Sequence, residues 1–221
     1  MHIEGLTKEY RNRSGSIQVL RGIGLSVYPG EMAAIMGPSG SGKSTLLFIL
    51  GLLLFPTAGT YLVMGRDIWK ADDNVQAEFR RRTIGFVFQS CNLVENTTVY
   101  ENLELPLIYA GVKRRERPAR VREALERVGL LERMHHPANL LSGGEQQRAA
   151  VARALVNHPR IVLADEPTGQ LDRRNGLLVL DHFQEIASRG ETAVVIVTHD
   201  PEVAARCNRK FMLEDGILRS G

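Results

Sequence analysis

A phosphate-binding pattern is formed by nine consecutive residues, Gly37, Pro38, Ser39, Gly40, Ser41, Gly42, Lys43, Ser44 and Thr45. Glycines let a backbone turn with its N–H groups pointing inward, and a helix that begins in the pattern adds partial positive charge. In this arrangement Lys43 reaches the β- and γ-phosphates of a nucleotide, and Ser44 binds magnesium. The alternative is a glycine-rich turn into a buried helix. The apolar run Met32–Met36 before the pattern and the helical spacing after it favour a phosphate loop.

Two adjacent carboxylates, Asp165 and Glu166, follow the apolar run Ile161–Ala164. A buried strand often ends in a polar residue, so part of this signal can be structural. Next to a phosphate loop, Asp165 can hold magnesium through water and Glu166 can polarise the water that attacks the γ-phosphate. The guanine-reading sequence Asn-Lys-x-Asp is absent from the chain, which favours adenine. The pair therefore predicts hydrolysis of ATP.

A capping box is formed by Ser142, Gly143, Gly144 and Glu145 at the start of a helical pattern that runs through Ala154. A well-capped helix with no further role is one interpretation. The glycines, however, leave bare N–H groups beside a serine hydroxyl at the positive end of a helix, which makes an anion site without a lysine. One complete and one incomplete phosphate site in the same chain favour head-to-tail pairing of two copies, so that each copy completes the other's site.

Apolar runs alternate with helical patterns along the chain, which is the order of a largely parallel sheet covered by helices. A C-terminal hairpin is indicated by the Asp215-Gly216 turn between apolar runs. The predicted strands are Leu25–Tyr28, Met32–Met36, Ile84–Phe88, Ile161–Ala164, Thr192–Thr198, Lys210–Glu214 and a returning strand from Ile217. Turns such as Pro29-Gly30 indicate that the chain before Gly37 also forms strands.

The pattern becomes helical between Thr98 and Gly144. Thr98 can cap a helix, Arg117–Val128 has amphipathic spacing, and Gly129 can end that helix. We therefore expect a helical insertion over residues 98–144 that packs on a core made of residues 1–97 and 145–221.

Composition bounds the class of protein. The 221 residues suit a single domain, and the net charge of +3 fits lipid headgroups, nucleotides or nucleic acid without choosing among them. Cys91 and Cys207 have no metal-ligand spacing, so neither a disulfide framework nor a zinc site is expected. The first residues lead into no apolar core, and the longest apolar run, Leu46–Phe55, is shorter than the roughly 20 residues that cross a bilayer. Contact with a membrane would therefore go through a partner.

The chain resembles the nucleotide-binding subunits of ABC transporters over essentially its whole length. The resemblance rests on GPSGSGKST at 37–45, VFQS at 87–90, LSGGEQQR at 141–148, IVLADEPTG at 161–169, QLD at 170–172 and THD at 198–200. It implies an α/β fold of the P-loop NTPase type. Such a fold has a mainly parallel core sheet, an N-terminal antiparallel β subdomain and an inserted α-helical subdomain, here within a single domain of residues 1–221. It also implies that the chain binds ATP and Mg2+.

The resemblance implies further roles for residues that are present here. Gln89 would sense and bind magnesium, His199 would contact the γ-phosphate, Tyr10 would stack on adenine, and Asp172 would face the other subunit together with Ser142, Gly143 and Gly144. Taken alone, His199 is more often a core or strand-end histidine, and Tyr10 can be a half-buried strand tyrosine. Gln170 departs from the asparagine of the family pattern, which alters a polar contact but keeps the acid at Asp172.

Residues 99–111, VYENLELPLIYAG, are similar to the lipoprotein-releasing and macrolide-exporting ATPases. This resemblance implies an ATP-bound homodimer and an integral membrane permease, with the chain on the cytoplasmic face of the inner membrane. It implies no nucleic acid partner, because the relatives that act on nucleic acid carry coiled coils, zinc cysteines or two fused domains. An ATPase that signals to cell-wall enzymes and a solute importer subunit remain alternatives. The leucines at 103, 105 and 107 form either a partner groove or internal packing.

Overall fold

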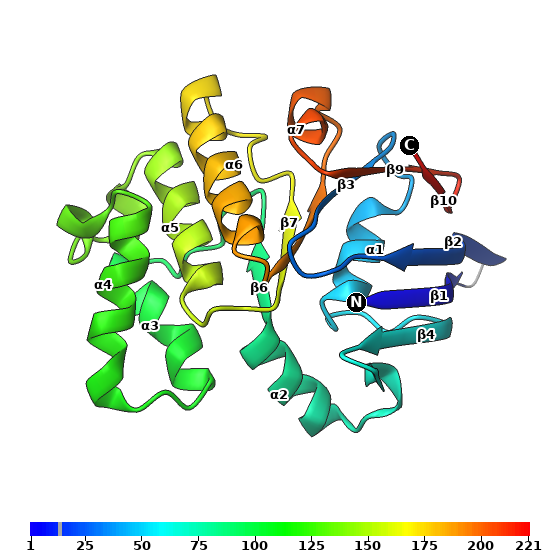
Figure 1. Cartoon of the computed structure of the whole chain (residues 1–221), viewed down its shortest axis with the longest axis horizontal. Helices are drawn as coiled ribbons and strands as arrows, with labels where there is room; N and C mark the ends of the chain where they lie inside the picture. The colour runs from blue at the N-terminus through cyan, green and yellow to red at the C-terminus, as the bar shows by residue number, and fades with distance from the viewer. Residues whose placement is uncertain (13–14) are drawn as a thin grey trace.

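The computed structural model describes residues 1–12 and 15–221, and Figure 1 shows their arrangement. The strands are β1 (His2–Asn12), β2 (Gly15–Ser26), β3 (Met32–Met36), β4 (Ala58–Val63), β5 (Arg66–Asp67), β6 (Ile84–Val87), β7 (Ile161–Asp165), β8 (Ala193–Val197), β9 (Arg209–Glu214) and β10 (Ile217–Ser220). The helices are α1 (Lys43–Leu50), α2 (Asp73–Thr83), α3 (Val99–Tyr109), α4 (Arg117–Arg127), α5 (Gly143–Leu155), α6 (Arg173–Ser188) and α7 (Pro201–Ala205), with short 3-10 turns between them.

The central sheet has the strand order β10-β9-β3-β8-β7-β6. Its neighbouring strands are parallel except for the β9–β10 hairpin. Alternate residues of a strand point to opposite faces, so Ala33 and Ile35 of β3 pack with α1, whereas Met32 and Ala34 pack on the side of α6. Both faces are therefore covered, which explains why these strands are almost entirely apolar.

A second sheet of four antiparallel strands has the order β2-β1-β4-β5 and shares its core with α1 (Figure 1). The prediction of strands before Gly37 is confirmed, but the range Leu25–Tyr28 is wrong. Strand β2 ends at Ser26 and begins at Gly15, because its exposed first half pairs with β1 through the backbone and needs no apolar pattern. The backbone N–H of Val27 then donates to Met1 O at 3.0 Å, and Tyr28 opens the predicted turn.

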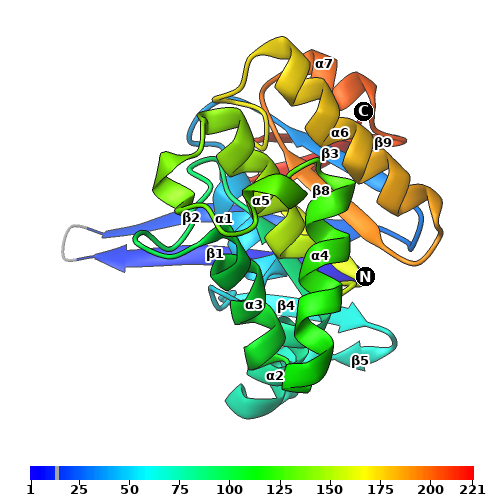
Figure 2. The same cartoon turned by 90° about the vertical axis from the view of Figure 1, so that its left-hand side faces the viewer.

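Helices α3 and α4 lie together on one side of the molecule and face the viewer in Figure 2. Thr98 and Glu101 form a capping box at the start of α3, as expected for Thr98. Leu103 and Leu107 are fully buried and pack against α4 and α5, so internal packing is correct for these two residues. Helix α5 also packs on the central sheet, and the boundaries 98–144 of a helical subdomain stay a prediction.

Among residues 1–12 and 15–221, no helix has both the length and the apolar character needed to span a membrane.

Candidate nucleotide site

The predicted phosphate loop lies in a cleft at the carboxyl ends of four neighbouring parallel strands. The loop follows β3, His199 follows β8, Asp165 ends β7 and Glu166 follows it, and Gln89 follows β6. The cleft has a volume of about 490 Å³ and is lined by Val19, Ser39, Gly40, Gly42, Lys43, Ser44, Thr45, Gln89, Asp165, Glu166 and His199. Ligands of open parallel sheets bind at this edge, so sequence segments that lie far apart in the chain form one site.

The loop itself is built for close approach of backbone to a ligand. At Gly37, where φ is 153°, a Cβ would stand 2.1 Å from Leu213 O, so no other residue fits. The Lys43 Nζ donates to the carbonyl oxygens of Gly37 and Pro38 at 2.8 Å each. The buried Ser41 Oγ has no hydrogen-bond partner among the described residues. A lysine beside the loop at the start of α1 fits an anion bound in the loop.

Three oxygen-bearing side chains of the cleft fit a magnesium ion. Ser44 and Asp165 interact by a hydrogen bond, and the exposed Gln89 lines the same cleft. The Gln89 side chain also lies close to Gly169: its Nε2 is 3.2 Å from the position that a Cβ at Gly169 would take. Hydroxyl, carboxylate and amide oxygens are the protein ligands that Mg2+ prefers. Burial raises the pKa of Asp165, the charge of Glu166 raises it further, and the Ser44 hydrogen bond and Lys43 oppose the rise. A cation beside Asp165 would relieve this cost of ionisation.

We expect Asp165→Asn to raise the melting temperature at pH 7 in buffer without nucleotide or magnesium. The raised pKa means that the ionised carboxylate is less stable in the folded chain than in the unfolded chain. Folded Asp165 takes up a proton as the pH falls through the raised pKa, so the penalty disappears and the advantage of the variant should shrink toward about pH 4. Calorimetry at the two pH values measures this difference. A wild type that is the more stable form at pH 7 would contradict this account of the site.

Glu166 sits in a strained and closely held position. Its φ of 45° lies in the left-handed region, which costs a non-glycine residue on the order of 1 kcal/mol or more. Its N–H donates to Val197 O at 2.9 Å. Its Oε1 accepts from the His199 N–H at 3.0 Å and lies 2.7 Å from His199 Nδ1, and its Oε2 accepts from Thr198 Oγ1 at 3.1 Å. The two groups predicted to act on the γ-phosphate and its attacking water are thus in direct contact.

Tyr10 is placed differently from the other predicted residues. It lies on β1, is 43% exposed, and has the Lys8 Nζ 5.0 Å from the centre of its ring. It does not line the cleft, so its stacking on adenine stays a prediction. Val19 on β2 does line the cleft. It packs against the phosphate loop, since its Cγ1 is 3.1 Å from the position that a Cβ at Gly42 would take. The sequence offered no signal for Val19, because a half-buried valine on a strand is ordinary.

The serine and glycines at the start of α5 do not line the cleft around Lys43. Ser142 Oγ accepts from the Glu145 N–H at 3.4 Å, and Glu145 Oε2 accepts from the Ser142 N–H at 2.9 Å, so the predicted capping box is present. Ser142 and Gly143 are exposed. Ser142 and Asp172 line a separate open pocket, with Arg148 and Asn175 between them. Within one chain, these two groups therefore lie together but outside the nucleotide cleft.

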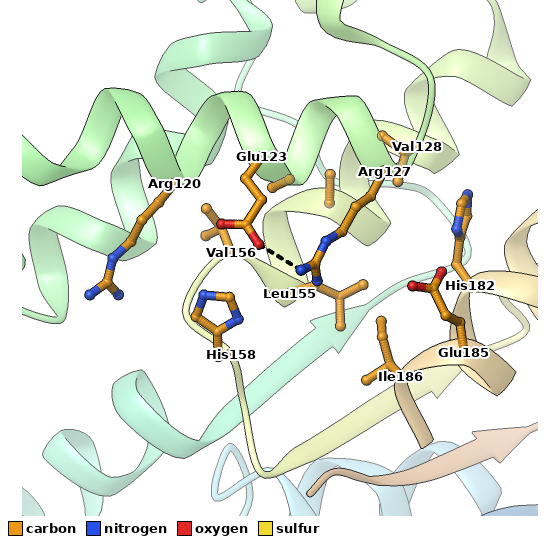
Figure 3. Close-up of a pocket in the computed structure, with 12 residues that line it drawn as sticks. Arg120, Glu123, Arg127, Val128, Leu155, Val156, His158, His182, Glu185 and Ile186 are labelled. Carbon is orange, nitrogen blue, oxygen red and sulfur yellow. Dashed lines mark hydrogen bonds and ion pairs between the residues drawn. The ribbon is translucent and has the colours of Figure 1, made fainter. Parts of the chain in front are cut away.

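A more enclosed cavity lies between α4, the end of α5 and α6, where Arg120, Glu123, His158 and His182 are among its lining residues (Figure 3). Its volume is only about 20 Å³, which is close to the space of one water molecule. It is too small to hold a nucleotide.

A model of the ABC transporter family matches residues 20–169 of the chain. The chain belongs to the ABC transporter family, and specifically to its ATP-binding proteins. It is 47% identical over 216 residues to the uncharacterized ABC transporter ATP-binding protein YvrO of Bacillus subtilis, covering 98% of this chain and 94% of that protein. It is 46% identical over 211 residues to the macrolide export ATP-binding/permease protein MacB of Salmonella typhimurium, covering 96% of this chain but only 32% of that protein.

The structure is similar to the dimeric post-hydrolysis state of the ATP-binding cassette MJ0796 bound to ADP and Pi. The TM-score is 0.92 at 41% identity, and the match covers 100% of this chain and 97% of that one. The predicted α/β fold with a mainly parallel core sheet, an antiparallel N-terminal sheet and added helices is thereby confirmed.

Proposed function

We propose that two copies of this chain bind two ATP molecules head to tail, hydrolyse them, and drive a separate membrane permease. The observation that carries this proposal is the division of phosphate-binding groups into two places. The cleft of one chain holds Lys43, Asp165 and Glu166, while Ser142 and Asp172 lie together outside it. A second copy, related by two-fold symmetry, can supply the missing half to each cleft. The dimeric structure of the similar cassette MJ0796 supports this arrangement.

The first step is the binding of the triphosphate by the loop. Lys43 Nζ exchanges its two bonds to the Gly37 and Pro38 carbonyl oxygens for bonds to phosphate oxygens. Ser44, Asp165 and Gln89 would hold the magnesium ion, which neutralises the developing phosphate charge when it is bound.

The second step is the activation of water by Glu166. Its carboxylate accepts the proton of the attacking water, and His199, 2.7 Å away, orients the carboxylate and contacts the γ-phosphate. Thr198 and the His199 N–H hold the same carboxylate in the present arrangement. Closure of the partner copy, with its Ser142, Gly143 and Gly144 facing the phosphates and its Asp172 beside them, excludes water and completes the site.

The partner is proposed to dock in an apolar groove that lies between α2, β6 and α3. The groove has a volume of about 610 Å³, and Leu53, Phe86, Phe88, Leu105 and Tyr109 are among the residues that line it. Leu53 is 50% exposed and Tyr109 is 66% exposed, so both side chains are accessible to a partner. Such a groove fits a short amphipathic helix of the permease on the cytoplasmic side of the inner membrane.

The similarity to MacB favours a complex that exports or extracts a lipoprotein, lipid or drug-like molecule. Leu105 supports the same proposal, because it lines the groove and belongs to the segment that is similar to the export ATPases. The cargo would be selected by the permease.

We expect Leu53→Glu with Tyr109→Glu to abolish co-purification with the permease and to leave basal ATP hydrolysis within about twofold, because both side chains lie outside the nucleotide cleft. Tyr28→Glu is the matched control, since Tyr28 is 60% exposed and does not line the groove. A tagged chain captured from detergent-solubilised membranes provides the measurement. A partner with a folded extracytoplasmic domain between its spans supports extraction, whereas a channel with many spans supports import and would overturn the export proposal.

A further inference from the structure

Asn175, in the first turn of α6, links Asp172 to Arg148 of α5. Its Nδ2 donates to Asp172 Oδ2 at 2.7 Å, and its backbone N–H donates to Asp172 Oδ1 at 2.8 Å. Its Oδ1 accepts from Arg148 Nη1 on α5 at 2.5 Å. Both ends of the amide are thus bound, and Asn175 cannot rotate away without losing two hydrogen bonds.

The same side chain fills the space beside Gly144. A Cβ at Gly144 would stand 2.8 Å from both Cγ and Nδ2 of Asn175, which is closer than real Cβ contacts, and 3.1 Å from Oδ1. A Cβ at the neighbouring Gly143 would meet no described atom within 4 Å. The φ angle of Gly144 is not positive, so its backbone conformation does not require glycine. The lack of a side chain at Gly144 is therefore explained by contact within the chain, whereas no such contact explains Gly143.

We propose that Asn175 is a positioning residue that fixes the start of α5 against the Asp172 segment, and that Gly144 is glycine because it must admit the Asn175 side chain. This inference rests on the proposed function, in which Ser142 and Asp172 both face the nucleotide of the partner copy. Asn175 makes these two groups one rigid unit, so that a single docking movement places both. Arg148 completes the unit from the next turn of α5, on the same face as Gly144.

The contact is tested by a double-mutant cycle on melting temperature that needs no nucleotide. We expect Gly144→Ala to lower the melting temperature in the wild-type background and to have little effect in the Asn175→Ala background, because the clash is then absent. The effect of Gly143→Ala should be the same in both backgrounds. Equal effects of Gly144→Ala in the two backgrounds would overturn the packing explanation, whether or not the chain is an ATPase.

The positioning role is tested on hydrolysis. We expect Asn175→Ala to lower kcat by about fivefold or more while the ATP affinity of the monomer is unchanged, since the cleft around Lys43 is intact. The factor by which Gly144→Ala lowers kcat should be at least about threefold smaller in the Asn175→Ala background than in the wild-type background. An unchanged kcat in Asn175→Ala, or losses that simply multiply in the double variant, would overturn the inference. A wild type that binds no ATP would instead overturn the proposed function, and the melting-temperature cycle separates the two failures.

Discussion

Glu166→Gln should lower the rate of ATP hydrolysis by about 10²- to 10⁴-fold and leave ATP binding intact. Glutamine keeps the size of the side chain and can still accept from the His199 N–H, which donates to Glu166 Oε1 at 3.0 Å. It cannot take the proton of the attacking water, so the loss falls on the chemical step. Phosphate release at saturating ATP and magnesium gives kcat, and calorimetric titration gives the affinity for ATP.

Glu191→Gln is the matched control for this prediction, because Glu191 is exposed and lies outside the cleft. It should hydrolyse ATP at the wild-type rate. If Glu166→Gln retained more than about a tenth of the wild-type kcat, Glu166 would not be the general base.

Lys43→Ala should weaken ATP binding by roughly 10- to 150-fold, which corresponds to the loss of about 1.5–3 kcal/mol for a hydrogen bond to a charged group. The side chain already reaches across the loop to two carbonyl oxygens, so it is placed to meet phosphate oxygens in the same space. Titration with magnesium ATP measures the affinity.

Lys113→Ala serves as the control for charge alone, since Lys113 is an exposed lysine outside the cleft. It should bind ATP as tightly as the wild type. Equal affinities for Lys43→Ala and Lys113→Ala would contradict the assignment of the phosphate loop.

The sequence predicted best those parts of the fold whose local chemistry is strong. Strands such as β3 and β7 are buried on both faces and are therefore continuous apolar runs, and the capping boxes at Thr98 and Ser142 mark their helices directly. Strand β2 was misplaced because its first half is polar and exposed, so only its pairing with β1 defines it. Strand β4 and helix α2 were not predicted, because only the last residues of β4 form an apolar run and the buried residue of α2 is the polar Gln76.

The candidate site was predictable where each segment carries its own chemical pattern. The loop around Lys43 and the carboxylates at 165 and 166 could be assigned by residue type, and the sheet brings them together. Val19 and Asn175 could not be found in this way. Their roles depend on contacts between segments far apart in the chain, such as Asn175 against Gly144, and no local pattern encodes such a contact. The placement of Tyr10 outside the cleft belongs to the same class of tertiary information.

The mass of the Glu166→Gln protein in solution with magnesium ATP tests the central claim most directly, since this variant should hold ATP without consuming it. Light scattering should give a dimer with ATP, twice the 24.6 kDa of one chain, and a monomer without nucleotide. Adding Ser142→Glu should return the protein to a monomer that still binds ATP through Lys43, because the new carboxylate repels the phosphates of the other copy. A Glu166→Gln protein that binds ATP and stays monomeric, or a dimer that Ser142→Glu does not disturb, would contradict the shared site.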